Sequence, residues 1–169
     1  MQQPDSMEKK FLEAFDGLSD ALFRHCFFRV SNREVAKDMV QDTFMKTWRE
    51  IDKGQQIENM QSFLYRVANN LIIDYYRKAK SDSLDALLDE GYDPKGDDAA
   101  GIVASSELGV TMRALDTLSE KDRRVLVMRH VDGLSPKEIA DSIGETENTV
   151  SVRIHRAAQR LKEKTHWVS

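Results

Sequence analysis

Residues 135–161 read SPKEIADSIGETENTVSVRIHRAAQRL, and this stretch predicts a short helix, a tight turn and a longer helix. Ser135 can cap the first helix, and Pro136 suits its first position because the missing N–H would be unpaired there. Glu138 can reach back to the cap, and Gly144 ends the helix. A short helix, a turn and a longer helix in this order are typical of a helix-turn-helix.

The longer helix is expected to start after Thr146, which can cap it, and to run to about Lys164. Its apolar residues fall on one face, so we expect that face to pack against the short helix. In a major groove, amide and guanidinium groups bond base edges, while flanking arginines hold phosphates. The predicted DNA-contacting residues are Asn148, Thr149, Ser151, Val152, Arg153, His155, Arg156 and Arg160.

The ordinary alternative for these polar side chains is a solvated helix face, since charged residues on an exposed helix usually contact nothing specific. We favour DNA contact because the capped short helix, the glycine turn and the longer basic helix occur together with matching apolar spacing.

The N-terminal part of the chain predicts three or four helices. Apolar residues recur at spacings of three and four on both sides of a break at Ser31 and Asn32. A stronger stripe marks a long amphipathic helix over about residues 59–80, preceded by a loop that carries Gly54.

The acidic charge of the chain is concentrated between residues 81 and 108, where eight side chains are acidic and one is basic. The rest carries 24 basic and 21 acidic side chains, so the net charge of -4 does not describe the two flanking parts. Weak periodicity and several glycines predict a flexible linker here. We therefore expect an all-α protein with helical domains at 1–80 and 106–169, joined by an acidic linker at 81–105.

Composition excludes several classes of protein. The content of 40% hydrophobic and 32% charged residues, with three prolines, suits a helical globular protein. No apolar run is long enough to cross a membrane and no signal peptide is visible, so we expect a cytoplasmic protein without membrane insertion. Cys26 is the single cysteine, and the histidines lack metal spacing, so neither a disulfide, a metal site nor a cofactor is expected.

Two ordered blocks of sequence carry a resemblance to a known family. The second block includes LSEKDRRVL from residue 118, RHVDGLS from residue 129 and RIHRA from residue 153. The first includes DMVQDTF from residue 38 and FLYRVANNL from residue 63. Together they resemble bacterial RNA polymerase sigma factors of the extracytoplasmic-function (ECF) group of the sigma-70 family.

The resemblance implies that residues 38–48 dock on core RNA polymerase. Exposed polar side chains off the apolar stripe would allow this, and ordinary surface charge is the alternative. The expected polymerase-binding residues are Asp38, Gln41, Asp42, Phe44 and Trp48, of which the two aromatic residues also suit a core position.

The resemblance also implies that the two domains read two promoter elements. The C-terminal helix would read the minus-thirty-five element as duplex, and the first domain would open the minus-ten element, capturing an extruded base near the loop at residues 51–61. A single strand needs stacking or hydrogen-bonding surfaces and positive charge. The expected minus-ten residues are Arg66, Asn69, Asn70, Asp74, Arg77 and Lys78. The acidic linker would thread the polymerase channel or act as a plain tether, and an anti-sigma factor is an implied partner.

Departures from the family pattern leave the promoter sequence open. The usual basic residue and serine after Val150 are replaced by Ser151 and Val152, and a common glycine is replaced by Asn148. The chief rival hypothesis is a helix-turn-helix repressor or activator that acts without replacing the sigma factor. An enzyme is a distant third, because no phosphate loop, metal spacing or nucleophile motif is present.

Overall fold

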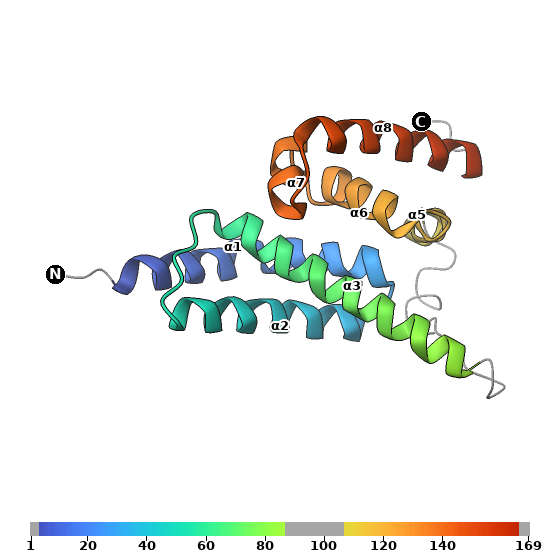
Figure 1. The fold of residues 1–169 in the computed structure, drawn as a ribbon. Helices are drawn as coiled ribbons and strands as arrows, with labels where there is room; N and C mark the ends of the chain where they lie inside the picture. The colour runs from blue at the N-terminus through green and yellow to red at the C-terminus, as the bar shows by residue number, and fades with distance from the viewer. Residues whose placement is uncertain (1–3, 87–106, 166–169) are drawn as a thin grey trace.

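The computed structural model describes residues 4–86 and 107–165, and within these ranges the chain is helical and forms no strand, which confirms the all-α prediction (Figure 1). The elements are α1 (Pro4–Val30), α2 (Arg33–Asp52), α3 (Met60–Ala86), α5 (Glu107–Asp116), α6 (Glu120–Leu126), a π-helical turn η1 (Val127–Val131), α7 (Pro136–Ile143) and α8 (Glu147–Thr165).

The break predicted at Ser31 and Asn32 is the corner between α1 and α2. Ser31 adopts a left-handed conformation with φ 56°, and its N–H donates to the carbonyl of Phe27 at 2.8 Å. The side chain of Asn32 then caps α2 by accepting from the N–H of Val35 at 3.1 Å. This corner reverses the chain, so α1 and α2 run side by side and α3 packs across both (Figure 1).

The core of the N-terminal half is built from the apolar stripes that the periodicity predicts. Leu22, Cys26, Leu64, Ala68 and Ile72 are all fully buried where α1 and α3 meet. Burying a leucine or isoleucine side chain contributes about 1.5–3 kcal/mol, so these stripes account for the alignment of the helices.

Helix α3 extends beyond its predicted end at Lys80 and continues to Ala86. The first residues of the predicted linker, 81–86, are therefore helical. Acidic composition alone does not stop a helix, and the first glycine after Lys80 is Gly91. The remainder of the predicted linker lies outside the described residues.

The C-terminal half has the helix-turn-helix that its caps predict. The hydroxyl of Ser135 accepts from the N–H of Glu138, and the N–H of Ser135 donates to the carboxylate of Glu138, both at 3.1 Å. Gly144 ends α7 with φ 73°, and Thr146 caps α8 by accepting from the N–H of Thr149 at 3.1 Å. The predicted boundaries of both helices are confirmed.

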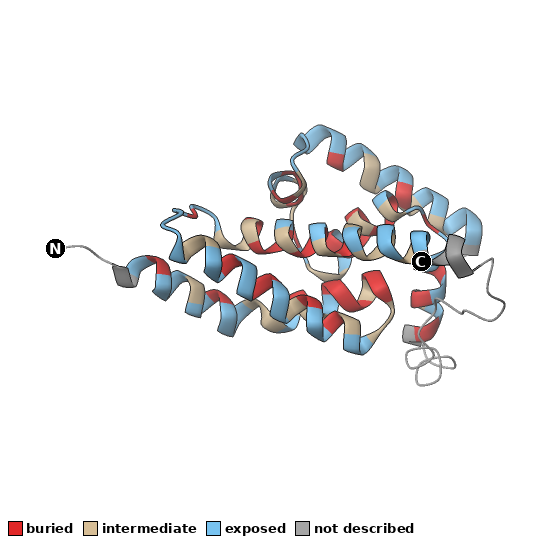
Figure 2. Ribbon diagram, turned by 60° about the horizontal axis from the view of Figure 1, so that its bottom comes forward, coloured by how far each residue is buried: buried red, intermediate tan, exposed pale blue. Residues whose placement is uncertain are grey.

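The two halves pack against each other in the structure. Helix α3 contacts α7, and α1 contacts η1. Figure 2 shows the buried residues gathered where helices face one another, with exposed residues along the outer sides of α2 and α8. This packing decides which predicted site residues reach solvent.

Candidate nucleic-acid interface

The N-terminal half of α8 presents its polar residues to solvent. Val150 and Ala157 are buried against the rest of the domain, so the opposite side of the helix is turned outward. The exposed predicted residues are Asn148, Thr149, Ser151, Val152, His155 and Arg156. The prediction that this helix offers a polar outer face is confirmed.

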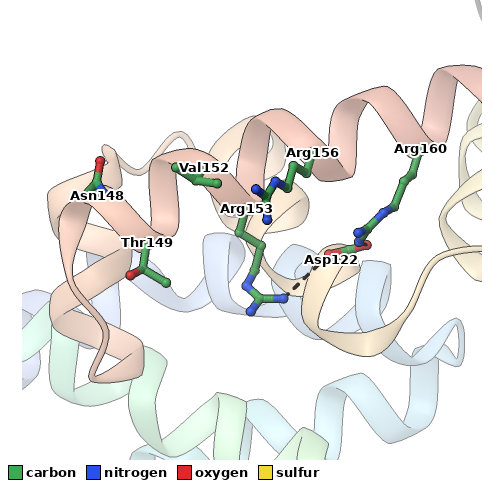
Figure 3. A pocket seen from close by; sticks show the side chains of 7 residues that line it. All are labelled: Asp122, Asn148, Thr149, Val152, Arg153, Arg156 and Arg160. Atoms are coloured by element: carbon green, nitrogen blue, oxygen red, sulfur yellow. Dashed lines mark hydrogen bonds and ion pairs between the residues drawn. The ribbon is translucent and has the colours of Figure 1, made fainter.

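A hollow of about 400 Å³ lies beside this face, between α8 and the start of α6 (Figure 3). Arg153 and Arg160 point from α8 toward Asp122 on α6, as Figure 3 shows. Arg160 donates from Nη1 to Oδ2 of Asp122 at 2.7 Å, and Nη1 of Arg153 lies 3.8 Å from Oδ1. Both flanking arginines predicted to hold phosphates are thus paired inside the domain.

Asp122 contacts the N-terminal cap of α6 through its backbone and α8 through its side chain. The hydroxyl of Ser119 does accept from the N–H of Asp122 at 3.3 Å, so the serine caps α6. The carboxylate instead turns to the arginines of α8. Its Oδ2 atom bonds Arg160, and its Oδ1 atom is buried without a hydrogen-bond donor.

A second hollow, of about 380 Å³, lies between the last turns of α2 and the middle of α3. Helix α3 contributes Asn70 and Asp74 to it, both predicted for the minus-ten element. Helix α2 also contributes Glu50, whose carboxylate lies 3.3 Å from Nζ of Lys53. Helix α2 and its C-cap residue together contribute three basic residues that we did not predict as DNA-facing, namely Lys46, Arg49 and Lys53. Their spacing of three and four residues places them on one side of a helix, and this signal was available in the sequence.

The other predicted minus-ten residues divide into exposed and interdomain groups. Arg77 and Lys78 are exposed on α3, and Arg77 lies 3.9 Å from Asp74. Arg66 is also exposed, but its Nη2 donates to the backbone carbonyl of Asp141 in the other half at 3.0 Å.

Asn69 is buried, unlike the other residues predicted for the minus-ten element. Only 3% of the residue is exposed, and its Oδ1 atom accepts from Nη1 of Arg29 at 2.8 Å. Tyr65, Asn69, Ile72 and Tyr76 recur at spacings of three and four, and this second stripe of α3 is covered by other parts of the chain.

Asn69 belongs to a buried polar network that joins the two halves. Nε2 of His25 lies 3.0 Å from Oδ1 of Asn69, and Nδ1 of His25 lies 2.7 Å from Oδ2 of Asp132 in the turn after η1. Both His25 nitrogens are thus within hydrogen-bond distance of side-chain oxygens, one from each half of the chain. Arg29, from the next turn of α1, reaches Asn69 and Glu120.

The network is buried deeply enough to perturb the groups within it. Burial lowers the pKa of Arg29, because desolvation disfavours the charged form, while Glu120 opposes that shift. Burial also raises the pKa of Cys26 to about 12, so this thiol stays protonated near neutral pH.

A further interdomain contact closes the end of α1. The Nε atom of Arg123 donates to the carbonyl of Phe28 at 2.7 Å, and its Nη2 donates to the hydroxyl of Ser31 at 3.1 Å. The hydroxyl of Tyr76 donates to the carbonyl of Arg29. The last carbonyls of α1, which its own helix cannot satisfy, are therefore bonded from outside.

The predicted polymerase-binding residues also divide by exposure. Asp38, Gln41 and Asp42 are exposed on α2 as expected. Phe44 is 4% exposed and packs edge-on against Phe11 and Phe15, so it occupies the core position that we gave as its alternative.

Trp48, by contrast, reaches the surface and joins an exposed apolar patch. The tryptophan is 39% exposed, and three other large apolar residues of α1 and α2 are exposed by about half. The patch consists of Leu12, Phe15, Met45 and Trp48.

Among the described residues no group of side chains is arranged to hold a metal ion. No helix in the described ranges is long and apolar enough to cross a membrane.

Comparisons with known proteins identify both halves. Residues 15–81 match the family model for Sigma-70 region 2, and residues 108–161 match that for Sigma-70, region 4. SigW, an ECF RNA polymerase sigma factor of Bacillus subtilis (strain 168), is 30% identical over 164 residues, which cover 91% of this chain and 88% of SigW. The chain belongs to the ECF sigma factors. It is therefore a sigma factor that acts with RNA polymerase in promoter-directed transcription initiation.

Solved structures of sigma factors share the fold. RpoE from Bartonella quintana, in complex with the anti-sigma factor NepR, matches with a TM-score of 0.70 at 24% identity, covering 92% of this chain and 96% of RpoE. CnrH, in complex with the cytosolic domain of CnrY, matches with a TM-score of 0.71 at 23% identity, covering 98% of this chain and 94% of CnrH. The match of both regions decides against a repressor or activator with a helix-turn-helix alone.

Proposed function

We propose that this sigma factor reads the minus-thirty-five element with the N-terminal half of α8. The observation that carries the proposal is the outward polar face of this half, with Asn148, Val152 and Arg156 on successive turns. Side chains so placed can reach base edges in a major groove. Arg156 is the strongest candidate for direct readout, because guanidinium forms bidentate bonds with guanine.

The minus-ten element is opened and held at the hollow between α2 and α3. Lys46, Arg49 and Lys53 supply positive charge, while Asn70 and Asp74 supply hydrogen-bonding groups. A single strand requires this combination, since phosphates need cations and unpaired base edges need donors and acceptors. Arg77 and Lys78 extend the basic surface along α3.

The two halves separate when both elements are bound. Asn69 and Arg66, which the family resemblance assigns to the minus-ten element, are engaged with α1 and α7 in the packed arrangement. Separation frees Arg66 from Asp141 and removes Met128 from Asn69, which makes this face of α3 accessible to the single strand.

Core RNA polymerase docks on α2, through Asp38, Gln41 and Asp42 together with Trp48. The apolar patch supports this surface, because an exposed aromatic residue beside acidic side chains suits a partner helix with apolar and basic residues. Phe44 contributes indirectly by packing beneath the patch.

We place this sigma factor in the cytoplasm, where its polymerase and promoters lie, and we propose that it has no catalytic activity of its own. An anti-sigma factor is a further expected partner, by analogy with RpoE and CnrH, which were both solved in complexes with partners. The division into domains at 1–80 and 106–169 with an acidic linker is retained, except that α3 carries the first boundary to at least Ala86.

The proposal is tested by selecting promoter fragments with the reconstituted holoenzyme, followed by run-off transcription. Arg156→Ala should weaken the binding free energy for the selected promoters by about 1–3 kcal/mol, and it should relax the base preference at one position. Gln159→Ala, on the same exposed side of α8, is the matched control. Equal loss across unrelated duplexes would assign Arg156 to the phosphates and contradict direct readout.

A further inference from the structure

The carboxylate of Asp122 is in an unusual position for a DNA-binding domain. It lines the hollow beside α8, where the guanidinium groups of Arg153 and Arg160 both point toward it (Figure 3). Its side chain is 3% exposed, whereas those of Arg153 and Arg160 are 34% and 54% exposed. The anion is thus fixed in the protein, while its cationic partners reach toward solvent.

This arrangement provides both arginines with a partner in the absence of DNA. Carboxylate and phosphate oxygens are bound by guanidinium in the same way. The Arg160–Asp122 bond of 2.7 Å is therefore one that a phosphate would have to replace or share.

We propose that Asp122 is a specificity-determining residue, which occupies the place of a DNA phosphate between Arg153 and Arg160. Sequence-independent binding to DNA depends on arginines and lysines that neutralise phosphates. Because Asp122 already neutralises these two arginines, they contribute little to the affinity of α8 for a duplex of random sequence. They exchange the carboxylate for phosphates only where matched bases hold the N-terminal half of α8 in place.

A third cation of α8, near its C-terminal end, is also paired within the domain. Nζ of Lys164 donates to the carbonyl of Thr117 at 2.6 Å, just before α6. The restrained cations of α8, namely Arg153, Arg160 and Lys164, are thus paired with groups of the same domain, whereas Asn148, Val152 and Arg156 are exposed. Discrimination between sequences rests on those exposed residues, as the proposed function requires.

The test measures binding of the full chain, without polymerase, to a labelled duplex of scrambled sequence over a range of salt concentrations. Each phosphate contact adds about 0.9 to the slope of log affinity against log salt. Asp122→Asn should steepen the slope by about one to two and strengthen binding at low salt. A fourfold rise in salt would then cost this variant about three- to twelvefold more affinity than the wild type.

Asp116→Asn is the matched control, because it makes the same change in net charge and also releases an arginine. Its partner, Arg123, bonds Asp116 at 2.6 Å but is turned toward α1 and is buried. The salt slope of Asp116→Asn should therefore equal that of the wild type. An equal increase in both variants, or no increase in Asp122→Asn, would overturn the proposal.

A double variant, Arg153→Gln with Arg160→Gln, provides a second test that leaves Asp122 in place. If Asp122 already neutralises both arginines, their loss should lower the slope by less than about one, whereas free arginines would lower it by about two. A decrease of about two in the salt slope of the double variant would overturn the proposal, even if Asp122→Asn does not fold. The inference about Asp122 rests on the proposed role of α8 in DNA binding. The scrambled duplex nevertheless tests it separately, because binding to that duplex does not depend on promoter sequence. Failure of Arg156→Ala to alter promoter preference would contradict the proposed function without touching the slopes.

Discussion

Replacing Asp132 with alanine tests whether the buried network holds the two halves together. Oδ2 of Asp132 lies 2.7 Å from Nδ1 of His25, and both side chains are fully buried. The alanine variant leaves this nitrogen without a partner while the halves stay packed, whereas water can bond it once they separate. The penalty of about 1–3 kcal/mol for a buried unpaired group therefore falls on the packed form alone. The ratio of packed to separated molecules should fall by about 5- to 150-fold.

The change in this ratio can be measured by energy transfer between dyes on the two halves. Lys37→Cys on α2 and Lys162→Cys on α8 provide exposed attachment sites. Cys26 does not compete for the dye, because it is buried and its pKa of about 12 keeps it protonated. Energy transfer should be lower in Asp132→Ala than in the wild type, with unchanged helical circular dichroism.

Asp141→Ala is the matched control for this experiment. Asp141 also lies in the C-terminal half, but its bond with Arg66 is made by the backbone carbonyl, which the substitution keeps. Energy transfer should stay at the wild-type value in this control. If Asp132→Ala unfolds at lower urea concentration but keeps wild-type energy transfer, the network stabilises each half separately and the reasoning is refuted.

Three further predictions concern the other surfaces. Trp48→Ala should weaken binding to core polymerase by at least about tenfold, because exposed aromatic residues dominate interfaces; unchanged affinity in a pull-down titration would move the docking surface elsewhere. Lys46→Ala should lower the salt slope for a single-stranded minus-ten oligonucleotide by about 0.7, one phosphate contact, and Lys37→Ala should not. Bonds from the Ser135 N–H and from Gln61 lower the pKa of Glu138 below 4.5, so its contribution is present above pH 4.5 and lost as the pH falls through the folded-state pKa. Glu138→Gln should therefore lower the free energy of unfolding in urea by about 0.5 kcal/mol near pH 6 and by close to nothing near pH 3. The expected change is small because Glu138 is partly solvated.

The helix-turn-helix could be predicted in detail because its boundaries are local. Ser135, Gly144 and Thr146 each act on backbone groups within four residues, and the structure places all three as expected. The end of α3 could not be predicted in the same way, because the residues after Lys80 are acidic but contain no helix breaker before Gly91.

Burial of individual predicted residues could not be foreseen, because it depends on contact between segments far apart in sequence. Asn69 is polar and lies among polar neighbours, but it is buried by Arg29 and His25, some 40 residues earlier. Phe44 belongs to a stripe whose other aromatic residue, Trp48, is exposed. Periodicity identifies the faces of a helix, but it does not tell which face another helix covers.

The bonds from Arg123 to the end of α1 make that end a natural reporter of domain separation. Once the halves part, Arg123 no longer reaches the carbonyl of Phe28 or the hydroxyl of Ser31, and the last turn of α1 loses an external restraint. The amide of Ser31, which donates to Phe27, should then exchange its hydrogen with solvent faster than amides in the middle of α1. Hydrogen exchange at this corner would follow opening in the unlabelled protein, alone or in the presence of promoter and polymerase.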